Sequence, residues 1–221
     1  MLSSPDSPNA KRDLVTAKSK RSDRYDPKAD ARLLTEVASA TDEAVRRSGA
    51  HLVCRAGCAE CCHGPFPISA LDAKRLAHGL EQLATSNPVA ARDIVATAAR
   101  QAAQFRTELG RNSLGREIEE EEALEALIER HSELPCPVLD PATLTCRLYA
   151  FRPIACRTFG PPIEIGGEKL PHCRLCFVGA NEEEIERCRV EVDPQDLEGE
   201  ILDTLVDHDR ESLIALVLAD L

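Results

Sequence analysis

The stretch Cys54-Arg-Ala-Gly-Cys58-Ala-Glu-Cys61-Cys62-His63-Gly64 places four cysteines within nine residues. Thiolates at spacings of four, three and one residues can converge on one metal centre if the loop wraps around it. Consecutive side chains diverge, so the adjacent Cys61 and Cys62 favour a polynuclear cluster, or two neighbouring sites, over one mononuclear ion. The stretch therefore predicts a metal-binding loop.

Two more cysteine-rich segments follow, Cys136-Pro-Val-Leu-Asp140 with Cys146-Arg-Leu-Tyr149-Ala-Phe-Arg152-Pro153-Ile-Ala-Cys156-Arg157, and His172-Cys173-Arg-Leu-Cys176. The last has the two-residue gap of a zinc knuckle, which is also the gap of a redox pair. Neighbouring cysteines make His63 and His172 possible additional ligands. The cysteines expected to bind metal are Cys54, Cys58, Cys61, Cys62, Cys136, Cys146, Cys156, Cys173 and Cys176.

Three arginines and no acidic residue lie between Cys146 and Arg157, in a chain whose formal charge is −11. Four thiolates around Zn²⁺, or around an iron–sulfur cluster, leave a net negative charge. We therefore expect the arginines to surround the metal centre and offset its charge, although they could instead pair with a Glu-rich helix. These arginines are Arg147, Arg152 and Arg157.

Composition and charge restrict the roles that ten cysteines can have in this chain. A charge of −11 disfavours nucleic acid or an anionic membrane as the main partner. No apolar run approaches the roughly 18 residues of a membrane helix, and the first thirty residues show no secretory stretch. We therefore expect a cytoplasmic protein, which favours metal thiolates over disulfides. Cys188 has helical surroundings and is expected to be an ordinary buried thiol.

These motifs resemble the CxxCxxCC cysteine-cluster family, also called the YkgJ-type family of zinc- or iron-chelating domains. The resemblance spans roughly Cys54 to Cys176, and flagellin lysine methylases carry a similar cysteine motif. It implies metal ligands at the seven cysteines from Cys54 to Cys156, and at either Cys173 or Cys176. Arg152, Pro153 and Arg157 fall in the matching RPxxCR segment. For most of this family no reaction is established, so the resemblance implies ligands rather than an activity.

Hydrophobic periodicity predicts a mainly α fold, in which a helical scaffold surrounds an irregular cysteine-rich metal-binding lobe with one or two short hairpins. Residues 1–27 are expected to form a disordered arm and residues 28–221 a single metal-binding domain. Within that domain we expect a helical insertion over residues 69–132 and the cysteine-rich lobe over residues 135–178. The expected helix starts and turns are Ser69, Asn87-Pro88, the stretch Asp140-Pro141-Ala142-Thr143, Gly166-Gly167 and Asp193-Pro194.

The function favoured by these features is a non-catalytic metal or cluster carrier, a sensor, or a metal-stabilised module that binds an unidentified protein partner. No catalytic constellation is evident outside the cysteines. Thiolate ligands suit iron–sulfur clusters and Zn²⁺ alike. The adjacent pair Cys61 and Cys62, and the presence of more cysteines than one four-ligand site needs, slightly favour an iron–sulfur cluster over Zn²⁺.

Two enzymatic alternatives stay open. One is a cluster-dependent protein methylase or another enzyme that uses S-adenosylmethionine. Cys54-x3-Cys58-x2-Cys61 has the spacing of radical S-adenosylmethionine enzymes, but Glu60 stands where that family usually has an aromatic residue. The other is a thiol oxidoreductase built on Cys61-Cys62 or on Cys173 and Cys176.

Overall fold

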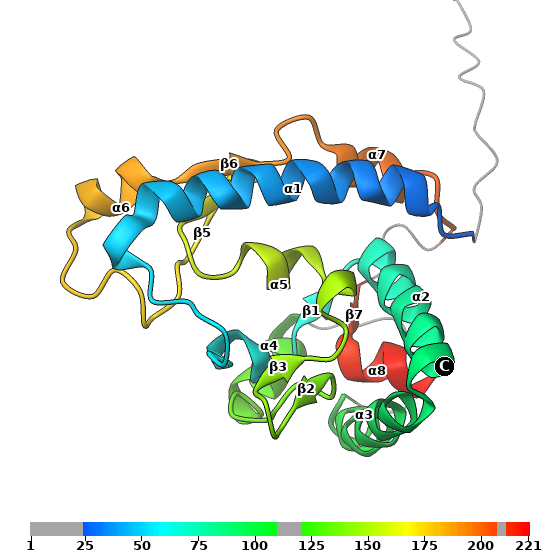
Figure 1. Cartoon of the computed structure of the whole chain (residues 1–221). Helices are drawn as coiled ribbons and strands as arrows, with labels where there is room; N and C mark the ends of the chain where they lie inside the picture. The colour runs from blue at the N-terminus through cyan, green and yellow to red at the C-terminus, as the bar shows by residue number, and fades with distance from the viewer. Residues whose placement is uncertain (1–23, 110–120, 207–210) are drawn as a thin grey trace, which may run out of the picture.

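The computed structural model describes residues 24–109, 121–206 and 211–221. In these ranges the chain is mainly α-helical, as predicted, with short strands and three single-turn 3₁₀ helices (Figure 1). The α-helices are α1 (Pro27–Ser48), α2 (Ala70–Ser86), α3 (Pro88–Glu108), α4 (Glu121–Arg130), α5 (Ile154–Thr158), α6 (Glu182–Cys188), α7 (Leu197–Leu202) and α8 (Ile214–Ala219). The strands are β1 (Pro67–Ile68), β2 (Leu139–Asp140), β3 (Thr145–Cys146), β4 (Ile163–Ile165), β5 (Glu168–Leu170), β6 (Val190–Val192) and β7 (Ser212–Leu213). The disordered arm expected over residues 1–27 lies almost wholly outside the described residues.

Helix ends follow local chemistry. The Asp26 carboxylate accepts hydrogen bonds from the amides of Lys28 and Ala29, and Pro27 occupies the first turn of α1. Ser69 caps α2 and Asn87 caps α3, as the sequence predicts. Helix α7 begins later than the expected opening at Asp193-Pro194. The Asp193 side chain instead accepts hydrogen bonds from the amides of residues 197 and 198.

Both predicted hairpins are present. Strands β2 and β3 pair antiparallel, with Leu139 opposite Cys146. Strands β4 and β5 pair antiparallel across Gly166-Gly167, whose φ values of 59° and 81° suit a two-residue hairpin turn. Two pairings were not predicted: β6 lies parallel to β4, and β1 pairs antiparallel with β7.

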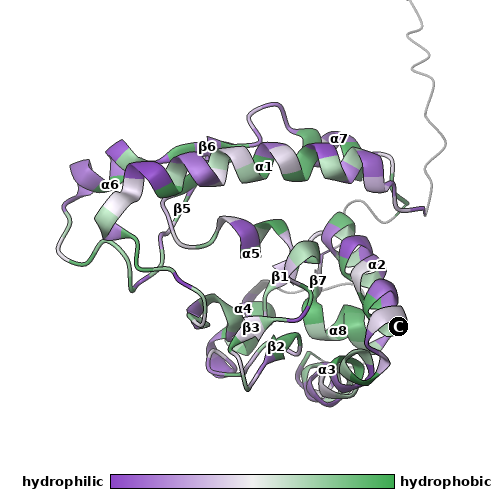
Figure 2. Cartoon of the chain, in the orientation of Figure 1, coloured by the Kyte–Doolittle hydropathy of each residue, from purple (hydrophilic) through white to green (hydrophobic). Residues whose placement is uncertain are grey.

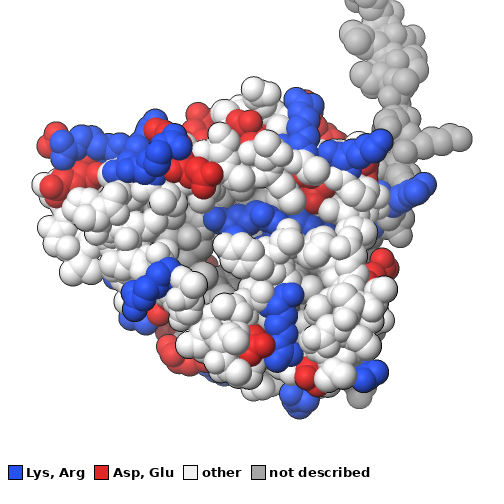
Figure 3. All heavy atoms as spheres, in the orientation of Figure 1, with Lys and Arg blue, Asp and Glu red and all other residues white. Residues whose placement is uncertain are grey.

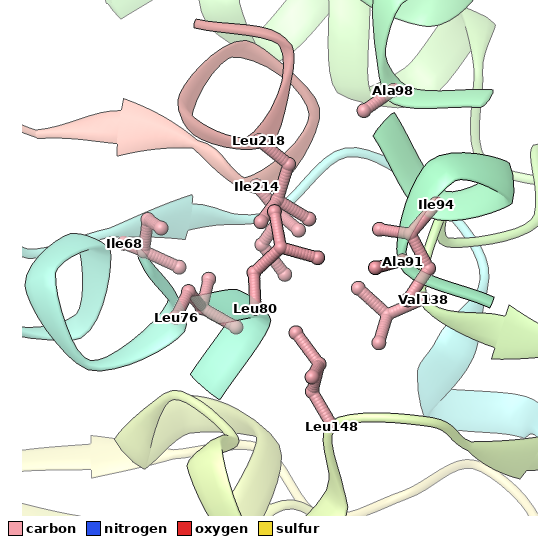
Figure 4. Close-up of a cluster of buried hydrophobic side chains, with 10 residues drawn as sticks. All are labelled: Ile68, Leu76, Leu80, Ala91, Ile94, Ala98, Val138, Leu148, Ile214 and Leu218. Carbon is pink, nitrogen blue, oxygen red and sulfur yellow. The ribbon is translucent and has the colours of Figure 1, made fainter. Parts of the chain in front are cut away.

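In Figure 2 the ribbon of α8 is coloured mostly as hydrophobic, whereas α1 alternates between hydrophilic and hydrophobic residues. The core drawn in Figure 4 joins α2, α3 and α8 to two residues of the cysteine-rich segment, Val138 and Leu148. A second core packs α1 against α5, β4, β6 and α7, and it includes Ile154 and Ile163. The cysteine-rich segment therefore shares its apolar residues with the helical scaffold.

The helices of residues 69–132 supply much of this shared core. Helix α3 packs along α8, and both pack against α2 (Figure 1). In the described parts of the chain, no helix combines the length and apolar character that crossing a bilayer requires.

Candidate metal centre

All ten cysteines lie in described parts of the chain, and all ten are free thiols. Nine of the cysteines lie in three segments that are distant in sequence, and backbone hydrogen bonds join these segments. The amide of Cys136 donates to the carbonyl of Cys62 at 2.8 Å, and the amide of Gly64 donates to the carbonyl of Leu134 at 2.8 Å. The first and second cysteine-rich segments therefore lie side by side.

A second set of backbone bonds brings the third segment to the start of the first. The amide of Cys173 donates to the carbonyl of Gly160 at 3.0 Å, and the amide of Phe177 donates to the carbonyl of His51 at 3.0 Å. Gly160 has a φ of +129°, and a Cβ at this position would lie 3.1 Å from the Sγ atom of Cys54. Cys54 thus lies against the backbone that holds Cys173 and Cys176.

The backbone contacts described above, together with the interactions between neighbouring thiols, place the nine cysteines in two groups. Burial, followed by interactions with Cys176, Cys173 and Cys58, raises the pKa of Cys54 to about 12. We call these residues the first thiol group, which consists of Cys54, Cys58, Cys173 and Cys176. Cys54 is exposed, whereas Cys173 and Cys176 are buried. The first group therefore opens to solvent on the Cys54 side.

The remaining thiols interact with one another and form the second thiol group, which consists of Cys61, Cys62, Cys136, Cys146 and Cys156. Burial raises the pKa of Cys136 to about 12 and raises that of Cys156 further, with the charges of the neighbouring thiols adding to both. A hydrogen bond from Cys61 lowers the pKa of Cys62, and the same bond raises the pKa of Cys61. The vicinal pair thus lies within one group.

The arginines predicted around the metal take two different positions. The Arg152 guanidinium stacks on the Tyr149 ring at 3.7 Å and donates to the carbonyl of Cys156 at 3.2 Å. Arg157 donates to the carbonyl of Arg152 at 3.0 Å. The positive charge of Arg152 favours ionisation of Cys61 and Cys146, because it acts to lower the pKa of both thiols. Within the described residues, neither Arg152 nor Arg157 forms an ion pair with a carboxylate.

Arg147 points elsewhere. Its guanidinium lies 3.4 Å from a carboxylate oxygen of Asp140 and 3.9 Å from one of Asp93. Figure 3 shows Lys and Arg atoms as a band across the middle of one face, at the level where Figure 1 places α5. Two of the three arginines are therefore close to the second thiol group, and the third pairs with aspartates.

The histidines near the cysteines have other contacts. The Nδ1 atom of His63 lies 2.8 Å from the carbonyl oxygen of Ala59. His172 packs edge-on against the Phe177 ring, on which His51 stacks. Cys188 is buried where α6 meets α1 and donates to the carbonyl of Arg47, as expected of an ordinary buried thiol.

The donor chemistry fits zinc or iron, because thiolates are the ligands that both prefer in cysteine-rich sites. Among the described residues, no set of three or more Cys, His, Asp or Glu side chains is arranged so that it could hold a metal ion as it stands. Metal binding would require the thiols of a group to lose their protons and to draw together.

The comparisons with known proteins agree with the donor chemistry. Residues 53–174, a little over half of the 221-residue chain, match the model of the CxxCxxCC family, which is described as "Putative zinc- or iron-chelating domain". No curated protein and no solved structure shows a match to the chain. The matched range contains the whole second thiol group and all but Cys176 of the first. The chain therefore belongs to the CxxCxxCC family of zinc- or iron-chelating domains.

Proposed function

We propose that the protein binds metal at two thiolate sites, and that it acts as a cytoplasmic metal or cluster carrier, a sensor, or a metal-stabilised module that binds a protein partner. The observation that carries the proposal is the separation of the nine predicted ligand cysteines into two groups. A single centre would leave several thiols without a role.

The two groups suit different centres. The first group has four thiols from two loops, Cys54 and Cys58 on one and Cys173 and Cys176 on the other, as in a four-thiolate zinc site. The second group has five thiols, including the vicinal pair Cys61 and Cys62. More than four thiolates and an adjacent pair favour a polynuclear centre, and an iron–sulfur cluster is the form we propose there.

Arg152 and Arg157 support this assignment. Neither guanidinium forms an ion pair with a carboxylate of the described residues, although the charges of Asp30 and Asp72 act on Arg157. The charge of Arg152 acts on Cys61 and Cys146, and that of Arg157 acts on Cys146, so positive charge lies beside the second thiol group. Ionised thiolates bound to iron would supply the balancing negative charge. In that arrangement Arg152 and Arg157 stabilise the anionic centre, and neither needs to contact the metal.

Elemental analysis and absorption spectra of protein purified without oxygen test the proposal. We expect metal at both sites, with iron and sulfide giving charge-transfer absorption and zinc giving none. Cys58→Ser should lower the metal content of the first site alone, and Cys146→Ser that of the second alone. Cys188→Ser is the matched control and should leave the metal content unchanged.

Four results would contradict the proposal. Metal-free protein, or equal losses from both sites in either variant, would remove the two-site assignment. Reversible disulfide formation between Cys61 and Cys62, or between Cys173 and Cys176, in place of metal would support a thiol oxidoreductase. Binding or cleavage of added S-adenosylmethionine would support the enzymatic alternative over a carrier.

A further inference from the structure

A buried group of charged side chains lies outside both thiol groups. Arg75 on α2 is 0% exposed, and its guanidinium binds the Asp30 carboxylate through both oxygens, at 2.5 and 2.8 Å. It also pairs with Asp72, one turn earlier on the same helix. Asp30 and Asp72 are 1% and 4% exposed, and the Tyr25 hydroxyl donates to Asp30 at 2.5 Å.

Such a group is costly to bury. Desolvation of paired charges often cancels their attraction, and apolar side chains of similar volume can be equally stabilising. Burial alone would lower the pKa of Arg75, but the two carboxylates raise it, so the guanidinium stays charged. A buried ion-pair group of this kind is therefore weak evidence for stabilisation, and its contacts with the rest of the chain indicate what else it does.

The group reaches the cysteine-rich segment at one place. The Asp72 carboxylate accepts a hydrogen bond from the amide of Ile154 at 3.1 Å, and Arg75 donates to the carbonyl of Arg152 at 3.5 Å. Ile154 is the first residue of α5, and the residue before it, Pro153, provides no side-chain cap. Asp72 therefore caps α5 from a different helix.

Helix α5 has five residues and cannot hold its position through its own hydrogen bonds. It carries Cys156 of the second thiol group, two residues after the capped amide. Arg152 and Arg157 lie just before and within the same short helix. The Asp72 cap and the burial of the Ile154 side chain against α1 together fix the first turn of α5, and the orientation of these three side chains depends on that turn.

We infer that Asp30, Asp72 and Arg75 are positioning residues of the second metal site, and this inference rests on the proposed function. They bind no metal. Asp72 fixes the first turn of α5 through the amide of Ile154. Arg75 binds the carbonyl of Arg152, just before α5, and Asp30 on α1 holds the Arg75 guanidinium in place. Together they set the direction from which Cys156 and the two arginines approach the centre.

Two conservative variants of Asp72 distinguish an effect on the position of α5 from an effect on the stability of the fold. Asp72→Asn keeps the length of the side chain and its acceptor oxygen but removes the charge. Asp72→Glu keeps the charge but adds one methylene, which displaces the capped amide. We expect Asp72→Glu to release metal from the second site to a chelator about tenfold faster and to change the absorption of that site, in the range found for groups that orient metal ligands. Asp72→Asn should release metal within about twofold of the wild-type rate, even though its melting temperature falls.

Asp220→Asn is the matched control, because it breaks the exposed ion pair with Arg106 far from α5. Asp220→Asn should change neither the rate of metal release to the chelator nor the absorption spectrum of the second site. The inference is overturned if Asp72→Glu is folded and releases metal at the wild-type rate with an unchanged spectrum. It is also overturned if Asp72→Asn and Asp72→Glu speed release equally, in proportion to lost stability.

A third variant covers the case in which Asp72→Glu does not fold. Asp30→Glu keeps the charge but adds one methylene, which displaces the Arg75 guanidinium from the α1 side without altering a contact of the cysteine-rich segment, and it should still speed metal release. An unchanged rate in that variant contradicts the inference. Absence of metal from the wild-type protein would instead contradict the proposed function itself, so the two failures are distinguishable.

Discussion

Gly160 lies directly against the thiol of Cys54, so close that a Cβ on the glycine would be 3.1 Å from the sulfur. We expect Gly160→Ala to displace Cys54 and to lower the metal affinity of the first thiol group about tenfold, as other changes in ligand orientation do. The measurement is a chelator competition with the purified protein.

The control separates this contact from backbone strain. Gly167 also has a positive φ, but a Cβ there would meet no atom within 4 Å. Gly167→Ala should therefore lower the melting temperature through strain while leaving metal affinity unchanged. Equal metal affinity in the two alanine variants would show that the contact with Cys54 is unimportant.

Gly79 on α2 packs beneath the Phe151 ring, and a Cβ at this position would overlap the ring. In an ordinary helix Gly→Ala stabilises. Here we expect Gly79→Ala to destabilise the protein by about 1–3 kcal/mol, because Phe151 cannot move without disturbing its core. Urea denaturation measures the change.

Gly199 on α7 provides the comparison. The nearest atoms to a Cβ there belong to the carboxylate end of the exposed Asp196 side chain, which can rotate away. Gly199→Ala should leave stability unchanged or raise it by about 0.5 kcal/mol. Destabilisation of similar size in both variants would contradict the packing role given to Gly79.

Glu198 accepts a hydrogen bond from the Ser69 hydroxyl at 2.8 Å and lies close to Asp72. Burial, together with the charge of Asp72, raises the pKa of Glu198 to about 7 from its ordinary value of 4.5. The folded protein therefore binds this proton more tightly than the unfolded chain. The contribution of Glu198 to stability is fully present below about pH 4.5 and is lost as the pH rises through 7.

Glu198→Gln should keep the hydrogen bond from Ser69 and stabilise the protein at pH 8 by at most about 3 kcal/mol. At about pH 4.5 the variant and the wild type should differ little. Chemical denaturation at both pH values measures the effect, with the exposed Glu200→Gln on the same helix as control. A variant no more stable than wild type at the higher pH would show that Glu198 is not a source of this pH dependence.

Arg152 and Arg147 offer a matched pair near the second thiol group. We expect Arg152→Gln to speed metal loss from this group several-fold, about tenfold at most, because a positive charge beside the thiolates is removed. If the centre contains iron, its midpoint potential should also fall, because the reduced, more negative form loses stabilisation. Potentiometry and chelator competition measure the two effects.

Arg147→Gln should have little effect on either quantity, because Arg147 faces Asp140 and Asp93. Arg152→Lys keeps the positive charge, so its rate of metal loss and its midpoint potential should lie between those of the wild type and Arg152→Gln. A larger effect from Arg147→Gln than from Arg152→Gln would reverse the roles given to the two arginines.

Much of the helical scaffold could be predicted because its signals are local. Ser69 and Asn87-Pro88 mark helix starts through their own side chains, and Gly166-Gly167 marks a turn through its backbone freedom. Helix α5 could not be predicted in this way. It is too short to show a period, and its cap, Asp72, belongs to a different helix.

The candidate ligands could be proposed from the cysteine spacing, but their division into two groups could not. Cys58 and Cys61 are three residues apart yet belong to different groups, whereas Cys54 and Cys176 belong to the same one. The division depends on which loops share backbone hydrogen bonds, such as the bond between Cys173 and Gly160. Pairings of this kind between distant segments leave no local pattern in the sequence.

The pairing of β1 with β7 has a consequence for biosynthesis. Strand β1 follows the first cysteine segment closely, but its partner residues Ser212 and Leu213, and the buried residues of α8 after them, are made after all ten cysteines. A nascent chain that has not yet released residues 212–219 from the ribosomal tunnel lacks this partner strand and the core around it. The core beside the cysteines would therefore be complete only after those residues emerge, and we expect stable metal insertion to follow their emergence.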